Sequence, residues 1–193
     1  MNRVHLILLW HMHQPQYRDP ATGRYVLPWT RLHALKDYWG MVRLLEEFPG
    51  VHVTFNVVPS LAAQLEEYAS GLFEEPSFDL AFRPAEDLSA EEKDELLARG
   101  FQLDRENLLG RWPRYVELFE WAHAAGRTSP AATFGPRDWR DLQVLAQLAW
   151  MDEAWLAADP VISRLAGKGA DFTEQDKEQL RAKQLEQIGR AHV

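Results

Sequence analysis

The run Leu6-Ile-Leu-Leu-Trp-His-Met-His-Gln-Pro15 decides the fold expected for this chain. It is apolar without interruption from Leu6 to Trp10, which is typical of a strand buried on both faces of a parallel sheet. Polar side chains follow, and Pro15 ends the strand because proline cannot donate a ladder hydrogen bond. Side chains alternate along a strand, so His11 and His13 are predicted to point the same way. Ligand sites of α/β folds lie at the carboxyl ends of strands, so both imidazoles are candidates for a site.

Two strand–helix units are predicted in the first third of the chain. The strand at residues 4–12 is followed by an irregular, proline-containing loop at 14–29 and a helix at 30–48. An alternating strand at 51–57 and a helix at 59–71, opened by Pro59 and closed by Gly71, follow. These lengths predict a parallel βαβα arrangement. Asn56 lies near the carboxyl end of the second strand and is predicted to neighbour His13.

From Ser89 onward the pattern is helical, and no strand is predicted. Ser89-Ala-Glu-Glu92 is a capping box that opens a helix ending near Gly100. Further helices are expected at 104–125 with a bend at Pro113, from Pro136 on with an apolar face that reaches Leu156, at 160–166, and at 173–188 with Thr173 as its cap.

Composition narrows the class of protein. The chain has 193 residues and 46% hydrophobic content, enough for one domain with a sizeable core. A net charge of -8 with no basic patch argues against nucleic acid as a partner. The absence of cysteine leaves no disulfide framework. The apolar run near the N-terminus is too short for a signal peptide or a membrane span, so a cytoplasmic protein without membrane contact is expected.

Three runs carry a resemblance to a known family. They are Trp10-His-Met-His-Gln-Pro15, Pro28-Trp-Thr-Arg-Leu-His-Ala-Leu-Lys-Asp-Tyr38 and Phe55-Asn-Val-Val-Pro-Ser-Leu61. In this order they resemble the N-terminal part of glycoside hydrolase family 57, the α-amylase and 4-α-glucanotransferase group, whose first motif corresponds to the HxHQP run. The resemblance is strong over roughly the first third of the chain. After Ser89 it rests on the helical pattern and on the stretch Asp138-Trp-Arg-Asp-Leu-Gln-Val144.

The resemblance implies an α/β fold, the N-terminal part of an incomplete (β/α)7-type, TIM-like barrel with a large helical insertion. Residues 1–193 would form one part of the barrel domain, with the first two β/α units at 1–71 and a mainly helical region at 72–193. Two parallel strands do not complete a sheet, and family members continue into further strands. We therefore expect an N-terminal fragment, truncated after about two barrel strands.

The same resemblance implies a sugar-binding cleft at the strand ends. The expected substrate-binding residues are His11, His13, Gln14, Trp29 and Asn56. An imidazole or an amide both donates and accepts hydrogen bonds, as sugar hydroxyls require, and an indole ring can stack on a sugar face. The alternative is structural: strand-end histidines bonded to loops, and amides that satisfy loop backbone. For Arg31, His33, Lys36 and Asp37, solvated helix-surface charges are the ordinary explanation.

Family 57 enzymes are retaining and need two carboxylates roughly 5–5.5 Å apart. Both belong to later motifs, and no acid of this chain matches them, so no catalytic residue, metal ligand or cofactor is assigned. The expected function is that of the N-terminal part of a retaining glycoside hydrolase or glucanotransferase acting on α-glucans, inactive as a fragment.

Two alternatives remain open. The first is a metal-dependent hydrolase that binds a cation through His11 and His13, which would need further ligands at strand ends. The second is a non-catalytic helical interaction protein whose two strands pair with a partner.

Overall fold

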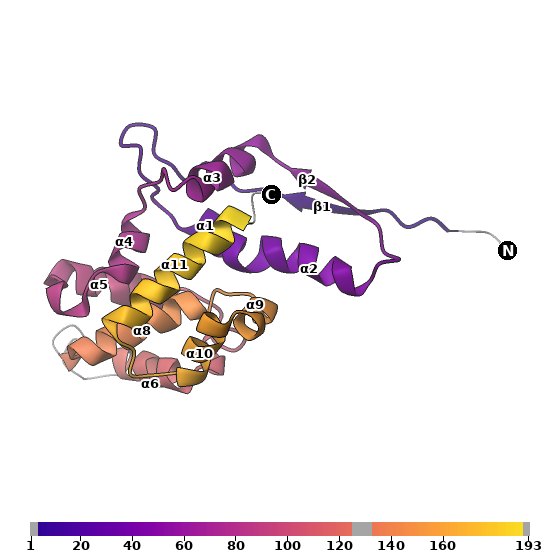
Figure 1. Cartoon of the computed structure of the whole chain (residues 1–193). Coiled ribbons are helices and arrows are strands. Elements are labelled where there is room, and N and C mark those ends of the chain that lie inside the picture. Colours follow the sequence, from indigo (N-terminus) through magenta and orange to yellow (C-terminus); the bar gives the residue numbers. More distant parts are fainter. Residues whose placement is uncertain (1–3, 125–132, 191–193) are drawn as a thin grey trace.

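The computed structural model describes residues 4–124 and 133–190. Strands β1 (Leu8–Met12) and β2 (Val53–Val57) form a parallel two-stranded sheet that projects from a larger helical body (Figure 1). Their register pairs Leu8 with Val53 and Met12 with Val57. The predicted parallel pairing is therefore confirmed, although β1 begins four residues later than expected.

A continuous helical segment leaves the loop after β1. It comprises α1 (Trp29–His33), the π-helical η1 (Ala34–Tyr38) and α2 (Trp39–Glu47). The predicted helix is confirmed, but its π-helical turn was not foreseen. Asp152 N–H donates to the Leu35 carbonyl at 3.2 Å, and a Cβ at Gly40 would collide with the Asp152 carboxylate. Glycine at position 40 of α2 therefore leaves room for the Asp152 side chain where it lies beside this helix.

The remaining helices form the body of the molecule. In chain order they are α3 (Pro59–Ala69), α4 (Pro76–Phe82), the 3₁₀ helix η2 (Ala85–Asp87), α5 (Ala90–Gly100), the 3₁₀ helix η3 (Leu109–Arg111), α6 (Pro113–Ala122), α8 (Pro136–Leu148), α9 (Glu153–Ala158), α10 (Pro160–Lys168) and α11 (Glu174–Arg190). The capping box at Ser89 and Glu92 is present, and Thr173 caps α11 by accepting from Asp176 N–H at 3.1 Å.

Two helix predictions need correction. The expected helix at 104–125 begins only at Pro113, because Trp112 takes the extended conformation that a residue before proline prefers. The helix from Pro136 ends at Leu148, and Leu156 lies on the separate helix α9. Asp152 starts α9 by accepting from Ala154 N–H at 2.8 Å, so a local cap divides what periodicity had joined. Helix α4 had no prediction.

The core lies in the helical body, with α8 at its centre. Trp139, Leu142, Leu145 and Leu148 of α8 are all buried, and side chains of α6, α10 and α11 pack in the same cluster. Each fully buried large apolar side chain contributes about 1.5–3 kcal/mol to folding. The helical body therefore carries most of the hydrophobic stabilisation.

The prediction that the first strand is buried on both faces is wrong for this structure. Leu6, Ile7 and Leu9 are 81%, 84% and 61% exposed. Trp10, expected in the core, is half-buried and meets Phe55 edge to face at 5.2 Å. Among the described residues no third strand pairs with either edge of the sheet. Burial of the apolar run requires such neighbours, and the described residues supply none.

Candidate functional site

Two histidines and an asparagine meet at the carboxyl ends of β1 and β2. His11 pairs in register with Asn56, and its Nδ1 lies 2.5 Å from Asn56 Oδ1. An amide oxygen only accepts, so His11 Nδ1 carries a proton, and in the neutral tautomer Nε2 is then an acceptor. The rings of His11 and His13 stack at 5.8 Å, which confirms that they share a face. We call His11, His13, Gln14 and Asn56 the strand-end cluster.

Asn56 was predicted beside His13 and instead bonds His11. The cause is the parallel register, which places residue 56 level with residue 11. His11, His13 and Asn56 are exposed. Their polar atoms are therefore accessible to a ligand at the strand ends.

Gln14 is held by two tyrosines. Its Nε2 donates to Tyr38 Oη at 2.9 Å, and its Oε1 accepts from Tyr17 Oη at 2.8 Å. Burial raises the pKa of both tyrosines, so both stay neutral near pH 7. Because the Tyr38 hydroxyl accepts from Gln14, its own hydrogen is left to donate. Gln14 therefore positions a phenol at the edge of the cluster.

One buried glutamine, Gln64, holds the loop at residues 14–29 that follows β1. Gln64 of α3 donates to the carbonyls of Pro15 and Ser60 at 3.0 and 2.9 Å. Its Oε1 accepts from Tyr17 N–H at 3.1 Å and from Thr30 Oγ1 at 3.3 Å. Both ends of loop 14–29 are thereby tied to α3, which holds the strand-end cluster in a defined place.

Trp29 is separated from the strand-end cluster and connected to it through an aromatic path. Its ring meets Trp150 at 5.8 Å and His33 at 6.4 Å, and His33 meets Tyr38 at 6.1 Å. The path from Gln14 to Trp29 thus runs through Tyr38 and His33. The structure brings together His11, His13, Gln14 and Asn56, and places Trp29 in a neighbouring pocket.

The charges on η1 form a compact group. Asp37 Oδ2 lies 2.5 Å from His33 Nδ1, and its Oδ1 accepts from Lys36 Nζ at 2.8 Å. Burial alone would raise the pKa of Asp37, but the hydrogen bonds from His33 and Lys36 outweigh it and hold the pKa below its usual range. These half-buried side chains are paired with one another, unlike the separately solvated charges that the sequence suggested.

The expectation that Arg31 is a solvated surface charge is wrong. Its guanidinium makes two hydrogen bonds to Glu75, at 2.9 and 2.8 Å, and both side chains are buried. Glu75 also accepts from Tyr68 Oη at 2.8 Å, and Arg31 donates to Gln147 Oε1 at 2.9 Å. One sequence signal was available: Arg31 lies four residues before the apolar Leu35, and residues four apart share one face of a helix.

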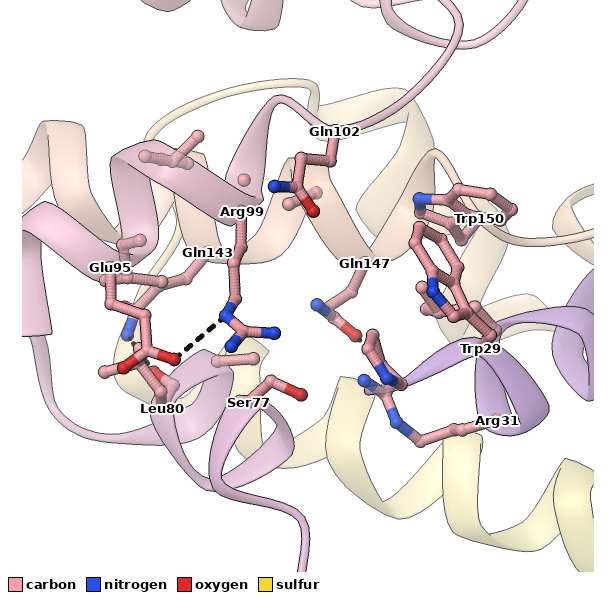
Figure 2. Close-up of a pocket in the computed structure, with 17 residues that line it drawn as sticks. Trp29, Arg31, Ser77, Leu80, Glu95, Arg99, Gln102, Gln143, Gln147 and Trp150 are labelled. Atoms are coloured by element: carbon pink, nitrogen blue, oxygen red, sulfur yellow. Dashed lines mark hydrogen bonds and ion pairs between the residues drawn. The ribbon is translucent and has the colours of Figure 1, made fainter. Parts of the chain in front are cut away.

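A pocket opens beside this buried pair, between α1, α4, α5 and α8. Figure 2 shows Arg99, Gln102 and Gln147 around it, with Trp29 and Trp150 on one side. Its cavity volume is about 70 Å³, and the pocket is partly open to solvent. Sequence reasoning missed it because its walls come from segments more than a hundred residues apart.

Comparison with models of protein families identifies the family of this chain. The sequence model described as glycosyl hydrolase family 57 matches residues 7–109, slightly more than half of the chain. The chain belongs to glycosyl hydrolase family 57. Comparison with curated proteins and with solved structures found no match.

Family 57 membership confirms the resemblance given by the three sequence runs. All three runs lie within the matched residues. It implies a glycoside hydrolase type of enzyme and a carbohydrate substrate. None of the helices within residues 4–124 and 133–190 is both long and apolar enough to cross a membrane.

The metal-dependent alternative gains no support from this family 57 structure. Among the described residues no group of three or more His, Cys, Asp and Glu side chains is placed to hold a metal ion. His11 Nδ1 instead bonds Asn56 Oδ1, which leaves only Nε2 of this ring for a ligand.

Proposed function

We propose that this family 57 chain supplies one edge of the substrate cleft of a retaining enzyme that hydrolyses or transfers α-glucosyl units. The observation that carries the proposal is the strand-end cluster, in which the exposed His11 and His13 stack and Asn56 sets the His11 tautomer. Hydroxyl groups both donate and accept, so the His11 Nε2 acceptor and the Tyr38 hydroxyl donor are complementary to them.

The proposal assigns binding rather than bond cleavage to these residues. A general acid works best with a pKa raised toward the working pH. Asp19, in the loop after β1, accepts from Ala21 N–H and Thr22 Oγ1, and these bonds lower its pKa. Asp37 is engaged by His33 and Lys36. The nucleophile and the acid/base of the retaining mechanism are therefore proposed to lie outside the strand-end cluster and its flanking segments.

The barrel architecture is part of the same proposal. Each of β1 and β2 is followed by a helix and the two are parallel, as in the first units of a (β/α) barrel. The exposed Leu6, Ile7 and Leu9 would be covered by further strands of that barrel. Residues 1–71 would supply its first two units, and residues 72–193 the helical region beside the cleft.

His13→Ala is expected to weaken maltotetraose binding about fivefold, which is the loss of one hydrogen bond. Because His13 is exposed, the melting temperature should change little. The measurement is a maltotetraose titration followed through the imidazole C–H resonances of the full chain. Signals of His11 and His13 should shift and saturate, while the exposed His52 serves as an internal control. Unchanged binding with a large drop in melting temperature would show that His13 is structural and would contradict the proposal.

The chain alone is expected to release no reducing sugar from maltooligosaccharides. Removal of an enzyme's main catalytic groups can cost on the order of 10⁶-fold in rate. The assay is incubation of purified chain with maltoheptaose and quantitation of new reducing ends, with a commercial amylase as the positive control. Turnover that disappears in Asp37→Asn would place a catalytic carboxylate on η1 and overturn the assignment made here.

A further inference from the structure

We propose that the pocket between α1, α4, α5 and α8 is a second sugar-binding site, which takes one neutral pyranose ring. The choice of a glucosyl unit as its ligand rests on the proposed function above. The pocket itself is separate from the strand-end cluster, and Trp29 is the predicted site residue that lines it. Its cavity volume is about 70 Å³, smaller than the roughly 300–1,000 Å³ of pockets that bury drug-sized ligands, which limits the ligand to a single small ring that stays partly in solvent.

An aromatic wall bounds one side of the pocket. Trp29 and Trp150 are half-buried, and their rings meet at 61° with centroids 5.8 Å apart. In such an edge-to-face pair, at least one ring has a face that the other ring does not cover. Figure 2 shows both indoles at the same side of the space. His33 also meets both rings, at 6.4 Å from Trp29 and 5.9 Å from Trp150, and the indole surface that lines the pocket is suited to the apolar C–H face of a pyranose.

A buried amide is aimed into the same space. Gln147 is only 8% exposed, and its Oε1 accepts from Arg31 at 2.9 Å and from Gln184 at 3.3 Å. These bonds commit the oxygen and fix the side chain, so its nitrogen faces the pocket (Figure 2). Within the described part of the chain, Nε2 has no hydrogen-bond partner and is not among the buried, unsatisfied atoms. It is therefore a preorganised donor that a ligand in the pocket can reach.

The opposite side of the pocket supplies further polar groups. Gln102, exposed on the turn after α5, extends its amide toward the centre of the pocket (Figure 2). Ser77 donates its hydroxyl hydrogen to Glu75 at 2.5 Å, which leaves its oxygen as an acceptor. Both donors and acceptors therefore line the pocket beside its aromatic wall, and a sugar ring with several hydroxyls can satisfy both kinds.

The charges around the pocket cancel, which selects an uncharged ligand. Arg31 is neutralised by Glu75 at 2.8 Å. Arg99 is paired with Glu95 at 2.9 Å, as the dashed line in Figure 2 shows. An anion or a cation would have to compete with one of these pairs, whereas a neutral sugar leaves both intact.

The test is a titration of the full chain with methyl α-D-glucoside, followed through the tryptophan indole N–H resonances. Signals of Trp29 and Trp150 should shift and saturate together, while the half-buried Trp121 on α6, outside the pocket, should not move. D-Glucuronate, the anionic counterpart of the same ring, should bind at least severalfold more weakly. Unmoved pocket signals, or tighter binding of glucuronate, would overturn the inference.

Gln102→Ala should weaken methyl α-D-glucoside binding about fivefold without changing the melting temperature, because the side chain is exposed. The matched control is Gln175→Ala, another exposed glutamine, on α11 and outside the pocket. Equal affinities of the two variants would count against the site.

The strand-end signals of His11 and His13 separate this inference from the proposed function. Shifts of these signals with none at Trp29 and Trp150 would reject the second site alone.

Discussion

Arg31→Met is expected to lower the free energy of unfolding by about 3–5 kcal/mol, because it leaves a buried carboxylate without its counter-ion. Glu75 is fully buried, and two of its hydrogen bonds come from Arg31. The methionine is close in length to the lost arginine stem, so little of the effect would come from a cavity. Gln147 would also lose one of the two donors to its side-chain oxygen.

The pH dependence gives this prediction a second readout. Burial would raise the pKa of Glu75, but the charge and hydrogen bonds of Arg31 outweigh it, and the pKa is lowered. In the wild type, the contribution of the Arg31–Glu75 pair to the free energy of unfolding is therefore fully present above the unfolded-state pKa of Glu75. It is lost as the pH falls through the folded-state pKa of Glu75. Without Arg31, burial raises the pKa of Glu75. The variant should consequently be least unstable at acidic pH and lose stability as the pH rises.

Urea unfolding of both proteins between pH 4 and pH 8 measures the effect. The control is Arg99→Met, which breaks an exposed ion pair with Glu95 and should cost less than about 1 kcal/mol. A double variant, Arg31→Met with Glu75→Leu, should recover part of the loss, since no buried charge then remains. A loss below 1 kcal/mol for Arg31→Met alone would show that Glu75 finds water or another partner.

Ile7→Lys with Leu9→Lys is expected to lower self-association of the chain roughly a hundredfold. The wild type exposes Leu6, Ile7 and Leu9 beside an unpaired strand edge, and such an edge recruits other chains. Burying one large aliphatic side chain is worth about 1.5–3 kcal/mol, so removing two from a contact changes its association constant by about two orders of magnitude or more. Lysine also places charge on the edge, which natural sheets use against pairing.

Size-exclusion chromatography with light scattering, together with binding of a hydrophobic dye, measures this effect. Leu72→Lys is the matched control, because Leu72 is 78% exposed on the turn after α3, away from the strand edge. It should leave self-association unchanged. A wild type that runs as a monodisperse monomer with one sharp melting transition would contradict both this prediction and the proposed barrel, since an uncovered apolar strand would then be tolerated.

The predictions that rest on short-range chemistry agree with the structure. Ser89 and Glu92 cap α5, and Pro59 and Pro136 open their helices at the first helical turn. The shared orientation of His11 and His13 also follows from the alternation of a strand. Each of these signals is complete within a few residues, so no knowledge of the rest of the chain is needed to read it.

Apart from the parallel pairing of β1 with β2, predictions that depend on long-range partners failed or were missing. Arg31 was taken for a surface charge because its partner Glu75 is 44 positions away and its contact Gln147 is 116 away. The helix from Pro136 was drawn too long because Asp152, which caps α9, also bonds the carbonyl of Leu35. No periodicity within one segment contains that information.

By itself, the sequence determined the family, the parallel pair of strands and the polar residues at their ends, because motif and hydrophobic pattern are local properties of the chain. Only the tertiary structure decided the partner of Asn56, the burial of Arg31 and the pocket that joins Trp29 to Trp150. These features depend on register and on packing between distant helices, where shape, burial and charge pairing must be satisfied at once.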